Sequence, residues 1–275
     1  MSSKTRKLNK ERLEILIRNS KSESTWKTYK TALKNYGYKL PMTEQKVLIW
    51  LSNSTYGSKK VLNYYSALKS YSKLMGYSVK CDTERVRAAC RGLASEYSVS
   101  EKRTKFINRE QFNQLINFCS THRLEEFKHL CIIGYSLMLR IPSELLDTER
   151  SSIIRYGKEY KLKLKTRKNN NKTTVLDIPK KVDNLKPALS ASYLLQNGIK
   201  IKKTAFNKTL KHCAKCLGWI APNSYASHSL RRGATDEAAN KRHDINVIME
   251  KGGWKNKGSL KHYMKPSNHR FYQSN

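Results

Sequence analysis

Acidic residues are scarce in this chain of 275 residues. It carries 21 Asp and Glu against 55 Lys and Arg, which gives a formal net charge of +34 at pH 7. The few acids do not gather into a cluster along the sequence. Enzymes that work through divalent cations hold them with grouped oxygen ligands, mainly carboxylates. The sequence therefore argues against metal-dependent chemistry, and we expect no metal and no other cofactor.

Long apolar runs are lacking too. The longest lies near 130–139, where Gly134 and Ser136 interrupt it, and it is too short to cross a bilayer. We interpret it as a helix of the protein core. No secretory leader is recognisable at the start of the sequence, so we expect an intracellular protein without membrane contact.

Cysteines with metal-ligand spacing are almost absent. Of the six cysteines only Cys213 and Cys216, next to His212, are close in sequence. A structural zinc site needs a second pair of ligands, which the sequence does not show. We interpret the cysteines as reduced thiols buried on helices.

The basic excess is spread over the whole chain. The first hundred residues hold 20 basic and 7 acidic side chains, and the remainder holds 35 and 14. A surface adapted only for solubility usually mixes the two signs. A distributed excess instead predicts that both parts contact a polyanion such as a nucleic-acid backbone, with affinity that falls as salt rises.

The amino-terminal part shows helical periodicity. Aromatic and aliphatic residues recur at three- and four-residue steps in segments near 24–38, 42–52, 57–75 and 82–97. We predict a helical domain over 22–100, after a basic segment at 1–21 and before a short polar linker at 98–104. The polar faces of its helices carry candidate DNA-binding residues: Lys27, Lys30, Lys59, Lys60, Lys69 and Lys73.

The remaining part, 105–275, mixes two periodicities. Asn108 and Gln111 predict a capped helix to about 120, followed by a helix over 124–139 and by a further helix with Pro142 in its first turn. Alternation near 152–155, 159–165 and 173–178 predicts a three-stranded antiparallel sheet, with Tyr160, Leu162 and Leu164 on its core face. Further helices are expected near 184–197, 203–217, 228–241, 244–251 and 259–264. The predicted fold class is mainly α with a small antiparallel β-sheet.

Several residues fit the cleavage of a phosphodiester without metal. Such a reaction needs charge neutralisation on the phosphate, an aligned nucleophile and a proton for the leaving oxygen. Two guanidinium groups can hold the phosphate, a lysine can donate the proton, and a tyrosine can attack. His228 and Arg231 are three residues apart, which places both on one face of a helix.

These residues resemble the tyrosine recombinases, or phage-type integrases. Arg140 lies in the segment Leu139–Leu145 that matches the first-arginine motif, with Glu144 at its accessory acidic position. The sequence His228-Ser-Leu-Arg231 matches the His-x-x-Arg motif. Trp254, after a glycine, and Tyr263 fit the two positions that follow in this family.

The resemblance implies a fold and a mechanism. A helical, SAM-like core-binding domain would precede an α+β catalytic domain, acting on double-stranded DNA through dimers or tetramers. Tyr263 would attack the phosphate and form a 3′-phosphotyrosyl bond, without metal or ATP. The other implied catalytic residues are Arg140, Lys165, His228, Arg231 and Trp254, with Glu144 as an accessory residue. Lys165 is favoured as the hairpin lysine, and Lys168 is the alternative.

Other interpretations remain open at this stage. A type IB topoisomerase resembles the same catalytic set, and a DNA-binding protein can keep the fold without the chemistry. Tyr225 and Tyr272 are rival nucleophiles by residue type, and Arg232 is expected to contact phosphate or lie at the surface. Trp254 and the Arg232-Gly233 pair resemble eukaryotic mobile-element recombinases of the Crypton type. The protein is expected with DNA: in the nucleus of a eukaryote, or otherwise in the bacterial cytoplasm, the nucleoid or a virus-infected cell.

Overall fold

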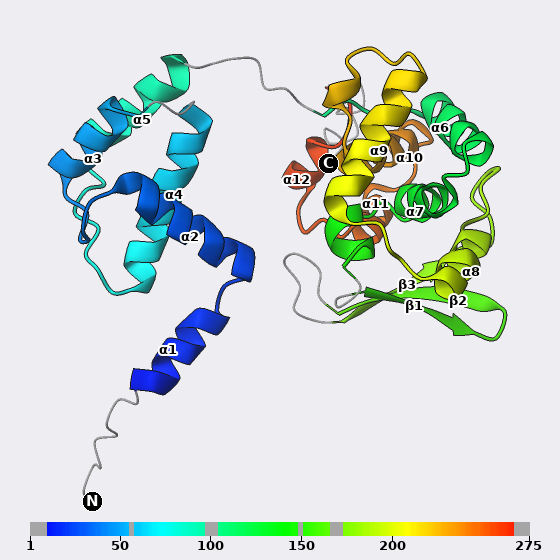
Figure 1. Cartoon of the computed structure of the whole chain (residues 1–275), viewed down its shortest axis with the longest axis horizontal. Helices are drawn as coiled ribbons and strands as arrows, with labels where there is room; N and C mark the ends of the chain where they lie inside the picture. The colour runs from blue at the N-terminus through cyan, green and yellow to red at the C-terminus, as the bar shows by residue number, and fades with distance from the viewer. Residues whose placement is uncertain (1–9, 55–57, 97–103, 148–150, 166–172, 267–275) are drawn as a thin grey trace, which may run out of the picture. The chain divides into compact units, whose positions relative to one another are not determined.

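The computed structural model describes residues 10–54, 58–96, 104–147, 151–165 and 173–266. The chain divides into two compact units, Met1–Glu101 and Lys102–Asn275, called unit 1 and unit 2 below (Figure 1).

Helices make up the described part of unit 1. They are α1 (Lys10–Asn19), α2 (Glu23–Tyr36), α3 (Glu44–Ser52), α4 (Ser58–Leu74) and α5 (Glu84–Glu96). Helix α2 begins at a Ser22 cap, whose hydroxyl accepts from the backbone N–H of Thr25, and ends at Gly37 with φ 74°. Helices α2 and α4 pack together through edge-to-face contacts among Trp26, Tyr29 and Tyr71. The predicted aromatic stripes therefore form core contacts.

Helix α1 lies within the basic segment predicted at 1–21. Its residues Leu13, Ile15 and Leu16 are exposed. The indole N–H of Trp26 donates to the carbonyl of Arg18 at 2.8 Å, which fastens the end of α1 to α2.

Unit 2 contains the sheet and the remaining helices. Helices α6 (Arg109–Thr121) and α7 (Glu125–Ser136) lead through the π-helical turn η1 (Ile141–Leu145) into strands β1 (Ser151–Tyr156), β2 (Glu159–Leu164) and β3 (Thr174–Ile178). Then follow α8 (Pro187–Asn197), α9 (Lys203–Cys216), the 3-10 turn η2 (Pro222–Ser224), α10 (Ser227–Asn240), α11 (Ile245–Gly252) and α12 (Lys257–Lys261). The capping box predicted at Asn108 and Gln111 is present at the start of α6, so that prediction is confirmed.

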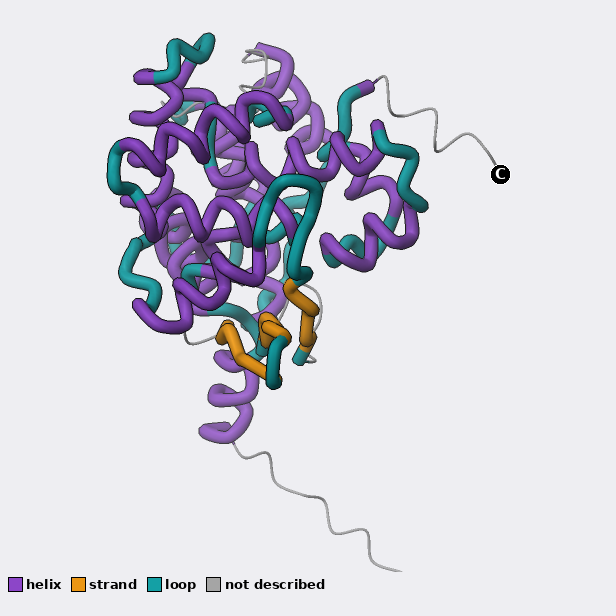
Figure 2. The backbone as a smooth tube through the Cα atoms, turned by 90° about the vertical axis from the view of Figure 1, so that its right-hand side faces the viewer, coloured by secondary structure: helices purple, strands orange, loops and turns teal. Residues whose placement is uncertain are grey.

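The three strands form one antiparallel sheet in the order β1-β2-β3. Leu162 of β2 lies opposite Ile153 of β1 and Leu176 of β3. Leu162, Leu164 and Ile178 are buried. Helix α8 packs against the sheet, which lies at one edge of the helices of unit 2 (Figures 1 and 2). The predicted fold class, mainly α with a small antiparallel sheet, is confirmed.

Helix α7 runs through the centre of unit 2, and its residues from Leu130 to Ser136 are all buried. It ends three residues before the predicted end, because Met138 adopts a left-handed backbone conformation with φ 51°. The N–H of Leu139 then donates to the carbonyl of Gly134 at 2.9 Å. A Cβ at Gly134 would lie 2.5 Å from Cδ1 of Ile141, so a larger residue there would have to displace the buried Ile141 side chain. Arg140 follows this turn, and its side chain is 14% exposed.

Four of the cysteines, Cys81, Cys119, Cys131 and Cys213, are buried as thiols. Among the described residues no group of His, Cys, Asp and Glu has the arrangement of a metal site. No helix in the described ranges combines the length and the apolar character needed to cross a membrane.

Candidate active site

Helix α10 positions His228 and Arg231 one turn apart. Its first turn is capped from a neighbouring helix, because Oδ1 of Asn207 in α9 accepts from the backbone N–H of Ser227 at 2.9 Å. The side chain of His228 is exposed next to this end of the helix. The positive end of the helix dipole and an exposed imidazole therefore lie together, which favours an anion there.

Arg231 is the largest fully buried side chain of the described chain. Its Nη1 donates to the carbonyl of Met138 at 2.7 Å, and its Nη2 donates to the carbonyl of Gly252 at 2.8 Å. The first carbonyl belongs to the left-handed turn after α7, and the second to the last residue of α11. These two bonds fix the plane of the guanidinium group.

Glu144 joins the two candidate arginines. Its carboxylate accepts from both Nη1 and the backbone N–H of Arg140, each at 2.8 Å. The same carboxylate lies 3.8 Å from Nη1 of Arg231. Glu144 is 2% exposed and Arg140 is 14% exposed, so the acid is buried between two cations whose charges offset the cost of its burial. Glu144 is thus placed to orient both arginines.

Trp254 packs directly on Arg231. Gly253, the residue after α11, has φ 70°, and the indole ring of the next residue lies 3.9 Å from the guanidinium carbon of Arg231. This is a cation–π distance. The side chain is 7% exposed, and its indole N–H is buried without a hydrogen-bond partner among the described residues. Buried donors are almost always satisfied in folded proteins, so this N–H is a candidate donor to a bound ligand.

Tyr263 lies over the same group of residues. Its ring meets Trp254 edge-on with centroids 5.1 Å apart, and lies 5.2 Å from the guanidinium carbon of Arg231. The centroid of the His228 ring is 6.4 Å away. The structure therefore brings together six of the predicted residues: Arg140, Glu144, His228, Arg231, Trp254 and Tyr263.

The segment that carries Tyr263 is anchored on both sides. Asn256 caps α12 by accepting from the N–H of Ser259 at 2.7 Å, and Leu260 and Met264 are buried. Oδ1 of the buried Asp236 accepts from the backbone N–H of Lys265 at 2.8 Å. Sequence reasoning missed Asp236. Its one signal is an acid within the alanine-rich α10 of a chain that has few acids.

Among the described residues, the other candidates of unit 2 have no recorded contact with this group. Lys165 follows the last residue of β2 and its side chain is exposed, whereas Lys168 lies outside the described residues. The guanidinium carbon of Arg232 lies 4.0 Å from the Phe106 ring, and its Nη1 donates to the carbonyl of Thr104. These contacts give Arg232 a packing role, and its contact with phosphate stays a prediction.

The rival nucleophile Tyr225 occupies a different environment. Its ring is 3% exposed and packs against Trp219, and its hydroxyl accepts from Nε2 of Gln111 at 3.2 Å. These contacts are with residues outside the group around Arg231, so the structure does not place this phenol beside the candidate phosphate ligands. Tyr272, the other rival, lies outside the described residues.

In unit 1 most candidate DNA-binding lysines are exposed. Lys27 and Lys30 lie on α2, and Lys59, Lys60 and Lys73 lie on α4. Lys69 differs because its ammonium group forms an ion pair with Asp82 at 3.2 Å and lies over the ring of Tyr65. The ammonium group beside Asp82 holds the pKa of that carboxyl below its usual value.

Comparison with known proteins assigns the family. Residues 105–270 match the phage integrase family, a span that contains every residue of the group described above. The chain belongs to the phage integrase family. No curated protein sequence matches it significantly.

Solved structures share the fold at low sequence identity. A lambda integrase dimer bound to a COC′ core site superimposes with a TM-score of 0.63 at 11% identity, over 92% of this chain and 75% of that one. The Tn1549 transposon integrase in complex with transposon right end DNA gives 0.64 at 11% identity, over 95% and 96%. A lambda integrase bound to DNA gives 0.62 at 12%, over 97% and 96%.

Proposed function

We propose that this protein is a site-specific DNA recombinase that cuts and rejoins DNA through a covalent bond to Tyr263. One observation carries the proposal: the ring of Tyr263 lies over Trp254 and Arg231, while Glu144 joins Arg231 to Arg140. A candidate nucleophile and two candidate phosphate ligands thus share one site, within the part of the chain that matches the phage integrase family.

The cationic side chains prepare the phosphate. Arg140 and Arg231 neutralise the charge that develops on the non-bridging oxygens, and the buried Glu144 holds both guanidinium groups in place. The orphaned indole N–H of Trp254 supplies a further donor to one of these oxygens. Because these donors are fixed before DNA arrives, little reorganisation is needed in the transition state.

The phosphoryl transfer then balances as follows. The phenolic oxygen of Tyr263 bonds to phosphorus, and the bond from phosphorus to the 5′ oxygen breaks. Lys165, or its alternative Lys168, gives a proton to the leaving 5′ oxygen, while His228 assists the loss of the phenolic proton. One phosphate ester replaces another, so a 5′-hydroxyl can later attack the phosphotyrosyl bond and rejoin the strand without ATP, metal or cofactor.

The two units have different roles: unit 1 binds DNA, and unit 2 carries the catalytic residues. Residues 22–100 form the core-binding domain, which meets the DNA backbone through the exposed lysines of α2 and α4, after the segment 1–21. Residues 105–275 form the catalytic domain.

Lambda integrase is seen as a dimer on its core site. By analogy this protein acts on double-stranded DNA as a dimer or tetramer, in the compartment that holds its DNA: the nucleus in a eukaryotic host.

Strand exchange separates this function from its alternatives. Two labelled duplexes that carry the end sequence of the protein's own element are incubated with it in EDTA, and recombinant strands are counted beside relaxation of a supercoiled plasmid. Recombinant strands that cross between the duplexes support the proposal. Relaxation alone indicates a type IB topoisomerase, and tight binding without either product indicates a DNA-binding protein that lacks the chemistry.

A further inference from the structure

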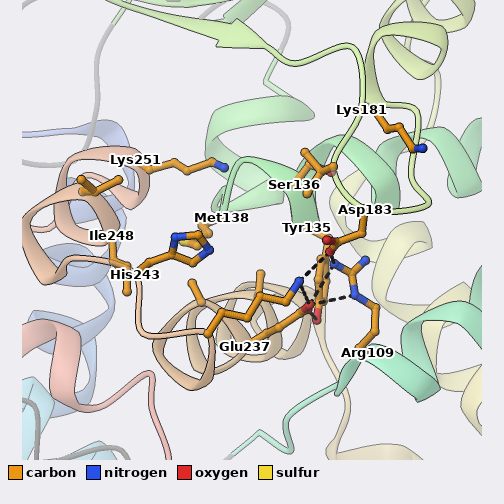
Figure 3. A pocket seen from close by; sticks show the side chains of 15 residues that line it. Arg109, Tyr135, Ser136, Met138, Lys181, Asp183, Glu237, His243, Ile248 and Lys251 are labelled. Carbon is orange, nitrogen blue, oxygen red and sulfur yellow. Dashed lines mark hydrogen bonds and ion pairs between the residues drawn. The ribbon is translucent and has the colours of Figure 1, made fainter.

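A cavity lies in unit 2 beside the candidate active site. It has a volume of about 560 Å³ and opens between the segment after β3 and helices α10 and α11 (Figure 3). Its floor is apolar and includes the buried residues Met138, Ala234 and Ile248. Lys181 and His243 are exposed at its rim. No side chain that lines the cavity takes part in the proposed chemistry.

Charge at the cavity favours an anion. Four Lys and Arg side chains line it against two acids, Asp183 and Glu237. Both acids are already bound, because Arg109 and Lys241 each contact the two of them in the network drawn in Figure 3. The phenol of Tyr135 also donates to Glu237 at 2.8 Å. Arg109 and Lys241 therefore neutralise the two acids, and the exposed Lys181 adds positive charge at the rim.

An unsatisfied polar group gives an independent indication of a ligand. Ser136 lines the cavity and is 4% exposed, and its hydroxyl has no hydrogen-bond partner among the residues that the structure describes. The same is true of the buried Nη1 of Arg109. Leaving such groups unsatisfied costs free energy, so two of them at one cavity are unusual unless a ligand completes them.

Residues that line the cavity also help to fix the position of Arg231. Met138 lines the cavity with its side chain, and its carbonyl accepts from Nη1 of Arg231. Lys251 lines it from α11, and the carbonyl of the next residue, Gly252, accepts from Nη2 of Arg231. Any ligand that moves or fixes these walls therefore acts on the two bonds that orient Arg231.

We infer that this cavity is a binding site for a small amphipathic anion, with an apolar body on the floor and a phosphate, sulfonate or carboxylate group at the rim. Ser136 and Arg109 donate to the polar atoms of the bound molecule, and Lys181 faces its charge. Occupancy is coupled to the candidate active site through Met138 and α11. This coupling rests on the proposed function, whereas binding does not.

The binding test uses phenyl phosphate as the probe, without DNA. Methyl NMR spectra of the full chain, with its methyl groups isotopically labelled, are recorded as phenyl phosphate is added. The salt concentration is chosen to suppress nonspecific anion binding. The methyls of Met138, Val182, Val247 and Ile248 are expected to shift, while those of Val61 and Val86 in unit 1 stay. Inorganic phosphate, which lacks the apolar body, should produce at least tenfold weaker changes. Equal shifts with both anions, or shifts confined to other methyls, overturn the proposal.

Variants locate the interaction. Ser136→Ala removes one donor without filling the cavity, and about a fivefold loss of affinity is expected. Lys181→Gln should also weaken binding, and Lys186→Gln, at another exposed lysine, should not. Val247→Trp covers the opening from a side chain that is 55% exposed, so it should abolish binding, whereas Val175→Trp at a similarly exposed position on β3 should not. Unchanged affinity in both Ser136→Ala and Val247→Trp overturns the site.

The coupling is tested by cleavage. Phenyl phosphate should change the rate of covalent adduct formation at least threefold in the wild type and leave Val247→Trp unaffected. An equal change in both proteins would place the probe in the active site and refute the coupling. Methyl shifts at the cavity in a protein that forms no adduct would support the binding site and contradict the proposed function, so the two failures are distinguishable.

Discussion

The carboxylate of Asp236 accepts a hydrogen bond from the backbone N–H of Lys265 at 2.8 Å. Asp236 lies on the helix that carries His228 and Arg231, and Lys265 is two residues beyond Tyr263. One buried acid therefore connects the residues proposed to hold the phosphate with the segment that carries the nucleophile.

Asp236→Leu should slow covalent adduct formation by about tenfold or more, because a hydrogen bond to a charged group contributes about 1.5–3 kcal/mol. DNA affinity should stay within about twofold, since no DNA-facing lysine is changed. Asp236→Asn keeps an acceptor oxygen and should recover most of the rate. A variant with normal cleavage and a lowered Tm would reduce Asp236 to a purely structural role.

Gly252→Ala tests the position of the Trp254 ring. A methyl group at Gly252 would overlap the indole ring, which has to leave the guanidinium group of Arg231 or strain the end of α11. We expect a loss of about 1–3 kcal/mol in the free energy of unfolding, as in other overpacked sites, together with slower cleavage.

Gly258→Ala is the matched control for this substitution. Its nearest heavy atom would be Oδ1 of Asn256 at 3.6 Å, which is an ordinary contact. Thermal unfolding and adduct formation should match the wild type in this variant. Equal behaviour of the two alanine variants would contradict the packing argument.

Replacing the leaving 5′ oxygen with sulfur tests which lysine is the general acid. Lys165→Ala should slow cleavage of ordinary DNA by about 100-fold or more, because the 5′ oxygen leaves without its proton donor. A substrate with sulfur in place of that oxygen should restore the rate, since a thiolate leaves unprotonated. If Lys168→Ala shows this pattern and Lys165→Ala does not, the assignment passes to Lys168.

Contacts between the lysines of unit 1 and the DNA backbone should be detectable in the salt dependence of DNA binding. Removing Lys60 or Lys73 should weaken binding to all sequences and reduce the slope of log K against log salt by about 0.9 for each lost phosphate contact. Lys69→Ala should change the slope less, because Asp82 already neutralises its ammonium group. Unchanged slopes in Lys60→Ala and Lys73→Ala would move the DNA interface to other side chains.

Local signals explain why much of the fold could be predicted. The Asn108 cap, the alternation in β2 and the helical stripes of α2 and α4 each depend on neighbours within a few residues, and the structure contains all of them. The left-handed turn at Met138 carries no such signal, because its residue type rarely adopts that conformation and the surrounding packing imposes it.

The candidate site was predicted by residue type but not by arrangement. Motif spacing placed His228 and Arg231 on one face of a helix. It did not show that Glu144 contacts both arginines, or that Asp236 holds the segment after Tyr263. These contacts join residues separated by up to 87 positions in the case of Glu144 and Arg231, and single-sequence patterns do not report such distances.

Covalent capture of DNA by Tyr263 tests the central claim most directly. The wild type and Tyr263→Phe are incubated in EDTA with labelled, nicked DNA that carries the end sequence of the protein's own element, and denaturant-resistant adducts are counted. Tyr225→Phe and Tyr272→Phe serve as controls. We expect an adduct in the wild type and both controls, and none in Tyr263→Phe, with equal DNA binding throughout. An adduct that persists in Tyr263→Phe, or no adduct on bound DNA with any of the proteins, would contradict it.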